Sequence, residues 1–230
     1  MKTKSKLNER KEELIAKYIQ SGYIESEEVI RAFREVPREK FIGENPARFA
    51  YLDRPLRIYS EQTISAPHMV AMMVSKKWFG LEVGDICLEI GAGSGYHAAV
   101  IAEIVAPSNV DESKWGHVYT IERIEKLVEF ARKNINNTSY DSRVTVIHAD
   151  GSIGLPGEAP FDKITVAAAA PKIPPPLLEQ LKPGGRLIIP VSGKGYFQEL
   201  MIAEKLKNGK VVTKSVCGVA FVPLIGKFGY

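Results

Sequence analysis

The sequence predicts a doubly wound α/β fold whose mainly parallel sheet ends in an antiparallel hairpin. From residue 85 onward, short apolar runs of strand length alternate with runs of helical period, which is typical of a parallel sheet covered by helices on both faces. A glycine-rich segment joins the first of these strands to the first helix. Near the C-terminus, Asn208 and Gly209 separate two apolar runs, as in a tight hairpin.

The elements of this core are expected in a regular order. The expected helices are 96–105, 124–134 and 175–181, the expected strands are 86–90, 118–121, 144–148, 163–168 and 186–191, and the closing hairpin pairs 200–206 with 211–217.

The N-terminal third has a different pattern. A helix is expected at 7–20 and another after Ser26, a residue suited to a helix N-cap. Residues 41–60 contain scattered aromatics and prolines without a period, which indicates an ordered, irregular segment. Pro67 suits the first position of a further helix, so we expect Ser65 beside that helix start.

Length and composition restrict the class of protein. At 230 residues, with 45% hydrophobic and 25% charged residues, the chain is expected to form a single domain over 1–230, in which 1–84 is a helical, substrate-covering part and 85–230 is the core. No apolar run approaches the roughly 18 residues of a membrane span, and the start lacks a secretory pattern. We therefore expect a cytoplasmic protein without a membrane partner, and we favour a monomer.

Charge and metal-binding residue types give weaker signals. The net charge of +4 is dispersed along the chain, so we expect no nucleic-acid partner. Cys87 and Cys217 lie in apolar runs and are expected to be packed thiols. No cysteine or histidine group has zinc spacing, and no metal is expected.

The segment EIGAGSG at 89–95 is the strongest single signal. Glycines between a strand and a helix allow a sharp turn and close approach of a ligand to the backbone. A nicotinamide site would prefer G-x-G-x-x-G, whereas here the third glycine comes one position earlier and Glu89 precedes the turn. Both features favour S-adenosylmethionine, whose ammonium Glu89 can meet. The expected contacts of the turn are Gly91, Gly93, Ser94 and Gly95.

Two acidic residues follow the next strands of the predicted sheet. Glu122 closes the second strand, where a carboxylate commonly accepts hydrogen bonds from a ribose diol. Asp150 and Gly151 follow the third strand, where the carboxylate can accept from an adenine amino group while glycine admits the ring. Together with the turn, these residues occur in the order expected of one cofactor crevice.

Further motifs are distributed along most of the chain. They are VPR at 36–38, YLDRPL at 51–56, QTISAPHM at 62–69, YTIER at 119–123, ADG at 149–151, APFD at 159–162, AAAAP at 167–171, LKPGGR at 181–186 and FVPL at 221–224. With these motifs the chain resembles the protein-L-isoaspartate (D-aspartate) O-methyltransferases, which start the repair of isoaspartyl residues. The motifs at 62–69 and 222–224 look specific to this family.

The resemblance implies a Rossmann-like methyltransferase fold, S-adenosylmethionine as cofactor, and isoaspartyl-containing proteins and peptides as partners. It implies that Ser65 belongs to the active site. Residues implied beside the substrate are Asp53, Thr63, Ile64, Ala169 and Pro171, and those implied at the cofactor are Ser94, Glu122, Arg123, Asp150 and Gly151. Two departures from the family pattern are residues 109–115, which look like an insertion, and 59–61, which replace a glycine-containing stretch.

The acceptor of such an enzyme is a free α-carboxylate, which is ionised at neutral pH because its unperturbed pKa is about 3.5. No catalytic base is required, so Ser65 is interpreted either as a hydroxyl that orients the carboxylate or as a simple helix cap. His68, His97 and His148 are expected to pack or form hydrogen bonds. Asp53 either contacts the peptide or braces its loop.

Two other functions fit parts of the sequence. An RNA or small-molecule methyltransferase would share the cofactor site, because that site does not identify the acceptor. A non-catalytic nucleic-acid-binding module would fit the basic composition. The motif at 62–69 argues against the first, and the intact cofactor motifs argue against the second.

Overall fold

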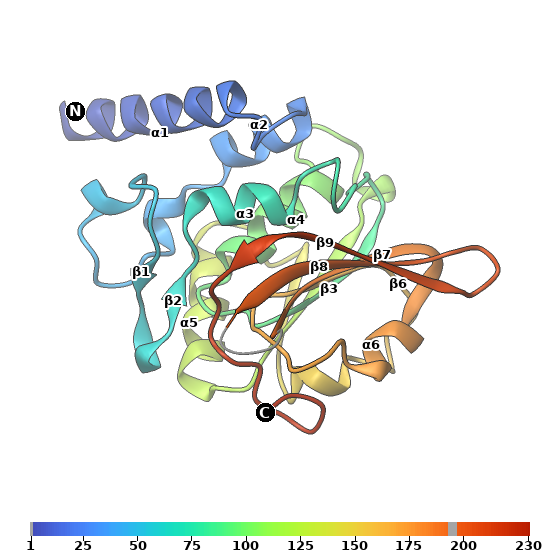
Figure 1. The fold of residues 1–230 in the computed structure, drawn as a ribbon. Helices are drawn as coiled ribbons and strands as arrows, with labels where there is room; N and C mark the ends of the chain where they lie inside the picture. Colours follow the sequence, from blue (N-terminus) through green and yellow to red (C-terminus); the bar gives the residue numbers. More distant parts are fainter. Residues whose placement is uncertain (1, 193–196) are drawn as a thin grey trace.

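The computed structural model describes residues 2–192 and 197–230 (Figure 1). A seven-stranded sheet has the order β5-β4-β3-β6-β7-β8-β9, in which β3 to β7 are parallel and β8 and β9 are antiparallel. The predicted doubly wound α/β fold is confirmed. The strands are β3 (Ile86–Ile90), β4 (His117–Glu122), β5 (Val144–His148), β6 (Phe161–Val166), β7 (Leu181–Ser192), β8 (Gln198–Lys205) and β9 (Val211–Val219).

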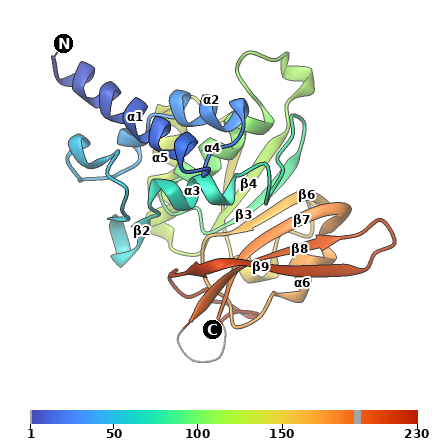
Figure 2. The same cartoon turned by 45° about the horizontal axis from the view of Figure 1, so that its top comes forward.

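Helices cover both faces of the sheet because neighbouring strand residues point in opposite directions. Cys87 and Leu88 are both fully buried, but they belong to different apolar clusters. The first cluster includes α1 (Lys2–Gln20), α2 (Glu27–Glu35), α3 (Pro67–Met73), α4 (Tyr96–Val105) and α5 (Glu125–Asn137), and the second includes α6 (Pro175–Glu179). Figures 1 and 2 show α1 to α5 on one side of the sheet and α6 on the other.

The C-terminal hairpin forms where the sequence predicts it. Gly209 has a φ of +82°, which favours glycine, and the Asn208 side chain accepts a hydrogen bond from the Lys210 amide at 3.0 Å. The helix expected at 175–181 ends earlier, at Glu179. Leu181 instead pairs with Phe161 and begins β7, so sheet pairing takes the end of that segment.

The N-terminal segment combines helices with short irregular elements. α1 begins at Lys2 rather than at residue 7, since no proline or glycine interrupts the added turn. The segment expected to be irregular contains the 3-10 turns η1 (Arg38–Lys40), η2 (Ala47–Phe49) and η3 (Tyr59–Glu61), and the strands β1 (Leu56–Arg57) and β2 (Thr63–Ile64) form a separate ribbon. Ser60 and Glu61 have φ values of +56° and +59°. Residues 59–61 replace a glycine-containing stretch of the family pattern, yet the left-handed backbone conformation that favours glycine is still present here.

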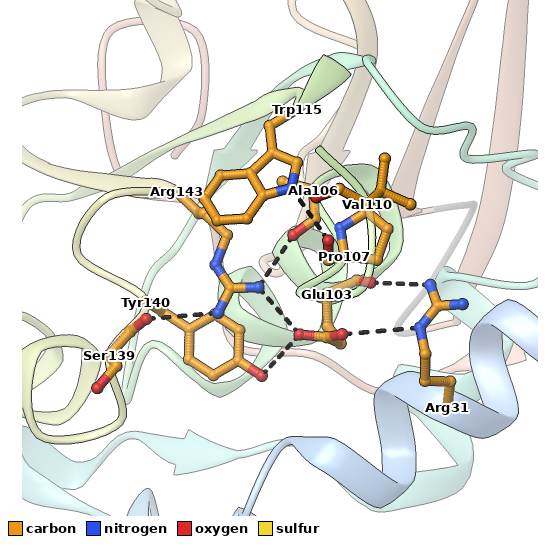
Figure 3. A network of polar contacts seen from close by, with 9 residues as sticks. All are labelled: Arg31, Glu103, Ala106, Pro107, Val110, Trp115, Ser139, Tyr140 and Arg143. Carbon is orange, nitrogen blue, oxygen red and sulfur yellow. Dashed lines mark hydrogen bonds and ion pairs between the residues drawn. The ribbon is translucent and has the colours of Figure 1, made fainter. Parts of the chain in front are cut away.

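A buried polar network joins α2 of the N-terminal segment to the core (Figure 3). Glu103 of α4 is 1% exposed, and its carboxylate accepts hydrogen bonds from Arg143 at 3.0 Å and from the Tyr140 hydroxyl at 3.1 Å. Arg31 of α2 forms an ion pair with the same carboxylate at 3.6 Å. The Arg143 guanidinium also lies 5.3 Å from the Trp115 ring, which anchors the segment 109–115 with its 3-10 turn η4 (Glu112–Lys114).

Within residues 2–192 and 197–230, none of the helices combines the length and the apolar character that a membrane crossing requires.

Candidate active site

A cavity lies beside β3, where the strand order of the sheet reverses between β4 and β6. In open α/β sheets, ligands usually bind in the crevice at this point. The cavity walls come from the β2–α3 region, from the strand ends of the core and from the C-terminal segment. The described lining residues are Gln62, Thr63, Ile64, Ser65, Val70, Met73, Ile90, Gly91, Ala92, Gly93, Ser94, Tyr96, His97, Ile121, Glu122, Arg123, Ile124, Leu127, Gly151, Ala167, Ala168, Val222, Pro223, Leu224 and Ile225.

The glycine turn separates a ligand-facing position from a packing position. Gly93 has a φ of +54°, and a Cβ built on it would meet only the Ile58 Cδ1 at 3.8 Å. The space beside Gly93 is therefore open to the cavity. Gly95, with a φ of +83°, does not line the cavity, and its Cβ would lie 3.2 Å from Ile135. Gly95 therefore lets α4 approach α5.

Glu122 ties the glycine turn to the end of β4. Its side chain is nearly buried, and one carboxylate oxygen accepts from the Gly93 amide at 3.0 Å. The other oxygen accepts from the amides of Arg123 at 2.9 Å and Ile124 at 3.0 Å. A carboxylate offers about four lone-pair sites. Glu122 thus keeps capacity for a ribose hydroxyl while it fixes the turn.

Glu89 lies behind the cavity wall rather than on it. It is fully buried, accepts a hydrogen bond from the Thr120 hydroxyl at 2.5 Å and pairs with His97 Nδ1 at 2.9 Å. His97 lines the cavity, and its Nε2 is buried without a hydrogen-bond partner in the described part of the chain. The expected packing and hydrogen bonding of His97 are present, but its place on the wall was missed. Nothing in the sequence indicates that His97 Nε2 is buried without a hydrogen-bond partner among the described residues.

Asp150 holds the C-terminal segment instead of lining the cavity. One oxygen accepts from the Ser152 amide and hydroxyl, and the other accepts from the Lys227 amide at 2.8 Å. Burial raises the pKa of Asp150, but these hydrogen bonds outweigh burial and lower the pKa. Gly151 lines the cavity at the start of η5 (Gly151–Ile153), and a Cβ on it would collide with Ile90 at 2.3 Å.

The motif at 62–69 supplies the opposite wall. Thr63, Ile64 and Ser65 all line the cavity, and Ser65 is half-buried. The helix-cap interpretation of Ser65 is wrong, because α3 begins at Pro67 with Ala66 at the N-cap and without a capping side chain. The Ser65 carbonyl accepts a hydrogen bond from Arg38 at 2.7 Å.

Asp53 braces the N-terminal segment from outside the cavity. Its carboxylate accepts from the Tyr18 hydroxyl at 2.5 Å and contacts His68 Nδ1 at 2.7 Å. Burial raises the pKa of Asp53, but the hydrogen bonds from Tyr18 and His68 outweigh burial and lower it. Asp53 thus connects α1 to α3, and of its two possible roles the structure displays bracing.

The AAAAP motif contributes through its first residues and its backbone. Ala167 and Ala168 line the cavity, whereas Ala169 pairs with the C-terminal segment: its amide donates to Val222 at 2.8 Å and its carbonyl accepts from Leu224 at 2.8 Å. Pro171 is exposed and does not line the cavity. Residues 222–225 were missed as lining residues, although 222–224 form one of the two motifs that look specific to the family.

The cavity fits an adenosyl cofactor at its core end. Arg123 and Ser94 stand beside Glu122 and the open space at Gly93, and the unpaired His97 Nε2 offers a further polar contact. Small residues, an acidic acceptor and an unpaired buried nitrogen suit a ligand that carries a diol and a zwitterionic tail.

Comparisons with known proteins identify the family. The sequence profile of the protein-L-isoaspartate(D-aspartate) O-methyltransferases (PCMT) matches residues 9–229. The chain belongs to this family. It is 52% identical to a protein-L-isoaspartate O-methyltransferase of Hyperthermus butylicus, over 96% of this chain and 91% of the relative. It is 49% identical to a protein of the same name from Methanothermobacter thermautotrophicus, over 94% of this chain and 95% of the relative.

A solved structure agrees with this membership. A Plasmodium falciparum protein assigned as a protein-L-isoaspartate O-methyltransferase superimposes with a TM-score of 0.81 at 31% identity, over 93% of this chain and 97% of that chain, and was crystallised with S-adenosyl-L-homocysteine. The predicted family, the methyltransferase class and S-adenosylmethionine as cofactor are confirmed.

Proposed function

We propose that the chain transfers a methyl group from S-adenosylmethionine to the free α-carboxylate of L-isoaspartyl residues in damaged proteins and peptides. The observation that carries the proposal is that Ser65 of the family motif and Gly93 of the cofactor turn line one cavity. The bound cofactor supplies a methyl group on a positively charged sulfur. An acceptor that enters along the Ser65 wall would therefore meet the cofactor inside the same space.

The residues of the core end have distinct roles in this proposal. Gly91, Gly93 and Ser94 cradle the cofactor, Glu122 accepts from the ribose, and Gly151 and Arg123 border the base. Glu89, Gly95 and Asp150 act indirectly, without lining the cavity. Glu89 pairs with His97, Gly95 lets α4 approach α5, and Asp150 holds the C-terminal segment.

At the acceptor end, the carboxylate is already a competent nucleophile, since its unperturbed pKa is about 3.5. No residue of the chain has to move a proton. Ser65 offers a hydroxyl to orient the anion, and Thr63 and Ile64 cover it. Apolar side chains of Val70, Met73 and Leu224 exclude water, which strengthens the attraction between acceptor and cofactor.

A paired-peptide assay tests the proposal. An isoaspartyl peptide and its normal aspartyl twin are offered with labelled S-adenosylmethionine, and a D-aspartyl peptide is included as a third acceptor. We expect methyl transfer to the isoaspartyl peptide and none to the aspartyl twin, because only the former presents a free α-carboxylate next to the extended backbone. Absence of turnover on the isoaspartyl peptide would remove the proposal, whatever happens with the other two.

An RNA or small-molecule methyltransferase remains the second candidate, since it would share the cofactor end of the cavity. Methylation of RNA by an enzyme that leaves the isoaspartyl peptide unmethylated would favour this candidate.

We further propose that residues 1–230 act as one domain, that the protein is a cytoplasmic monomer, and that it has no nucleic-acid partner. Light scattering of the purified chain and salt-dependent RNA binding check the oligomeric state and the partner.

A further inference from the structure

Arg38 is a wholly buried cation behind the acceptor wall. It lies in η1 with no exposed surface, and its Nε donates to the Ala50 carbonyl at 2.8 Å. Its Nη2 donates to the Ser65 carbonyl at 2.7 Å, and the guanidinium lies 4.8 Å from the centre of the Tyr96 ring. Both Ser65 and Tyr96 line the cavity. Arg38 thus contacts the back of two wall residues.

No acidic side chain neutralises this charge. Among residues 2–192 and 197–230, no carboxylate lies within ion-pair distance of Arg38, and its Nη1 is buried without a hydrogen-bond partner. The buried Arg143 differs, since it pairs with Glu103 at 3.0 Å. Burying an unpaired charge is costly. Burial lowers the pKa of Arg38, but an arginine remains protonated in proteins.

An anion on the other side of the Ser65 wall would offset this cost. Of the described lining residues, Arg123 is the sole lysine or arginine, and it follows β4 at the cofactor end. The acceptor end therefore has no cationic side chain on its surface. A buried positive charge, that of Arg38, lies directly behind Ser65, whose carbonyl accepts its hydrogen bond at 2.7 Å.

We propose that Arg38 is a positioning residue that fixes the Ser65 backbone and, through its uncompensated charge, selects an anionic acceptor over a neutral one. The inference rests on the proposed function, because it assigns the acceptor a carboxylate. Arg38 touches neither acceptor nor cofactor. Its effect is a local positive potential at the place where the α-carboxylate binds, held in a region of low dielectric where charges act strongly.

The test compares an isoaspartyl peptide with its α-carboxamide twin, which has the same shape without the charge. Dissociation constants for both are measured on enzyme saturated with S-adenosylhomocysteine, so that no turnover occurs. We expect the wild-type enzyme to bind the acid at least about 10-fold more tightly than the carboxamide, because a unit charge at an effective dielectric near 20 still has that effect at roughly 12 Å. Equal affinities would overturn the inference, and this measurement needs no variant.

Two variants separate charge from scaffold. Arg38→Gln should bring the acid-to-carboxamide ratio near one, while S-adenosylhomocysteine affinity shows that the cofactor end is intact. Arg38→Lys, which keeps the charge, should retain most of the ratio although it loses the forked hydrogen bonds. If Arg38→Gln weakens both peptides equally, or if Arg38→Lys matches it, the charge has no selective role. Failure of the wild-type enzyme to methylate any isoaspartyl peptide would instead remove the proposed function itself.

Discussion

Replacing Glu103 with alanine would remove the centre of the network that joins α2, α4 and the start of β5 (Figure 3). The change leaves the Arg143 guanidinium buried at 8% side-chain exposure without its carboxylate. Two backbone carbonyls, of Ala106 at 2.9 Å and of Ser139 at 3.4 Å, would still accept from Arg143. They satisfy hydrogen bonds but do not neutralise the charge.

The expected cost follows from which charges remain buried. Breaking a buried ion pair by removing one partner costs about 3–5 kcal/mol, because the other charge stays uncompensated. Arg31 adds less, since 27% of its side chain is exposed and water can solvate it. For a chain of this size, each kcal/mol lowers Tm by about 2–4 °C. We therefore expect Glu103→Ala to lower Tm by roughly 6–20 °C.

Glu12→Ala is the matched control. Glu12 pairs with Arg34 at 3.0 Å, between α1 and α2, but both side chains are nearly half exposed. Exposed pairs of this kind contribute about 0–1 kcal/mol. Urea unfolding of wild type and both variants gives the free energies of unfolding. If the two substitutions lower the free energy of unfolding by amounts within about 1 kcal/mol of each other, the inference that burial makes the Glu103 ion pair costly to break is refuted.

Three further predictions concern the cavity. Gly93→Val should abolish S-adenosylmethionine binding by calorimetry, because its side chain fills open space and its φ is positive, whereas Gly157→Val should bind normally. Ser65→Ala should slow turnover about 10- to 100-fold with nearly unchanged cofactor affinity, and an unchanged rate would remove its orienting role. The lowered pKa of Asp150 means that its carboxylate stabilises the fold above its unfolded pKa and that this contribution is lost as pH falls through the lower folded pKa. The stability difference between wild type and Asp150→Asn should therefore shrink below about pH 4, and a difference that grows in acid would contradict the contacts with Lys227.

Local sequence signals were sufficient for the core. The strand before Gly91, the helix after Gly95 and the Asn208-Gly209 hairpin follow from period and turn chemistry, which involve residues close together in the chain. The position of Glu122 at the end of β4 and on the cavity wall follows for the same reason, since the end of a parallel strand fixes the edge of the sheet at which it lies.

Long-range pairings were decided by the tertiary structure alone. The hydrogen bond from the Lys227 amide to Asp150 connects residues that are 77 positions apart in the sequence. The hydrogen bond from Arg38 to the Ser65 carbonyl connects residues that are 27 positions apart. The sequence shows that an acidic residue, Glu89, precedes the glycine turn. It does not show that His97 pairs with Glu89 and lines the cavity in its place.

The alternation of strands and helices, the cofactor turn and the family motifs can be recognised in the amino-acid sequence without a structure. The structure decided which side chains face the cavity and which hold the wall from behind. The physical reason is that period and turn preference act over a few residues, whereas burial and pairing of charges depend on which distant segments pack together. Arg38 shows the difference most clearly: the sequence marks it only as the last residue of the VPR motif, and its burial away from water is visible only in the structure.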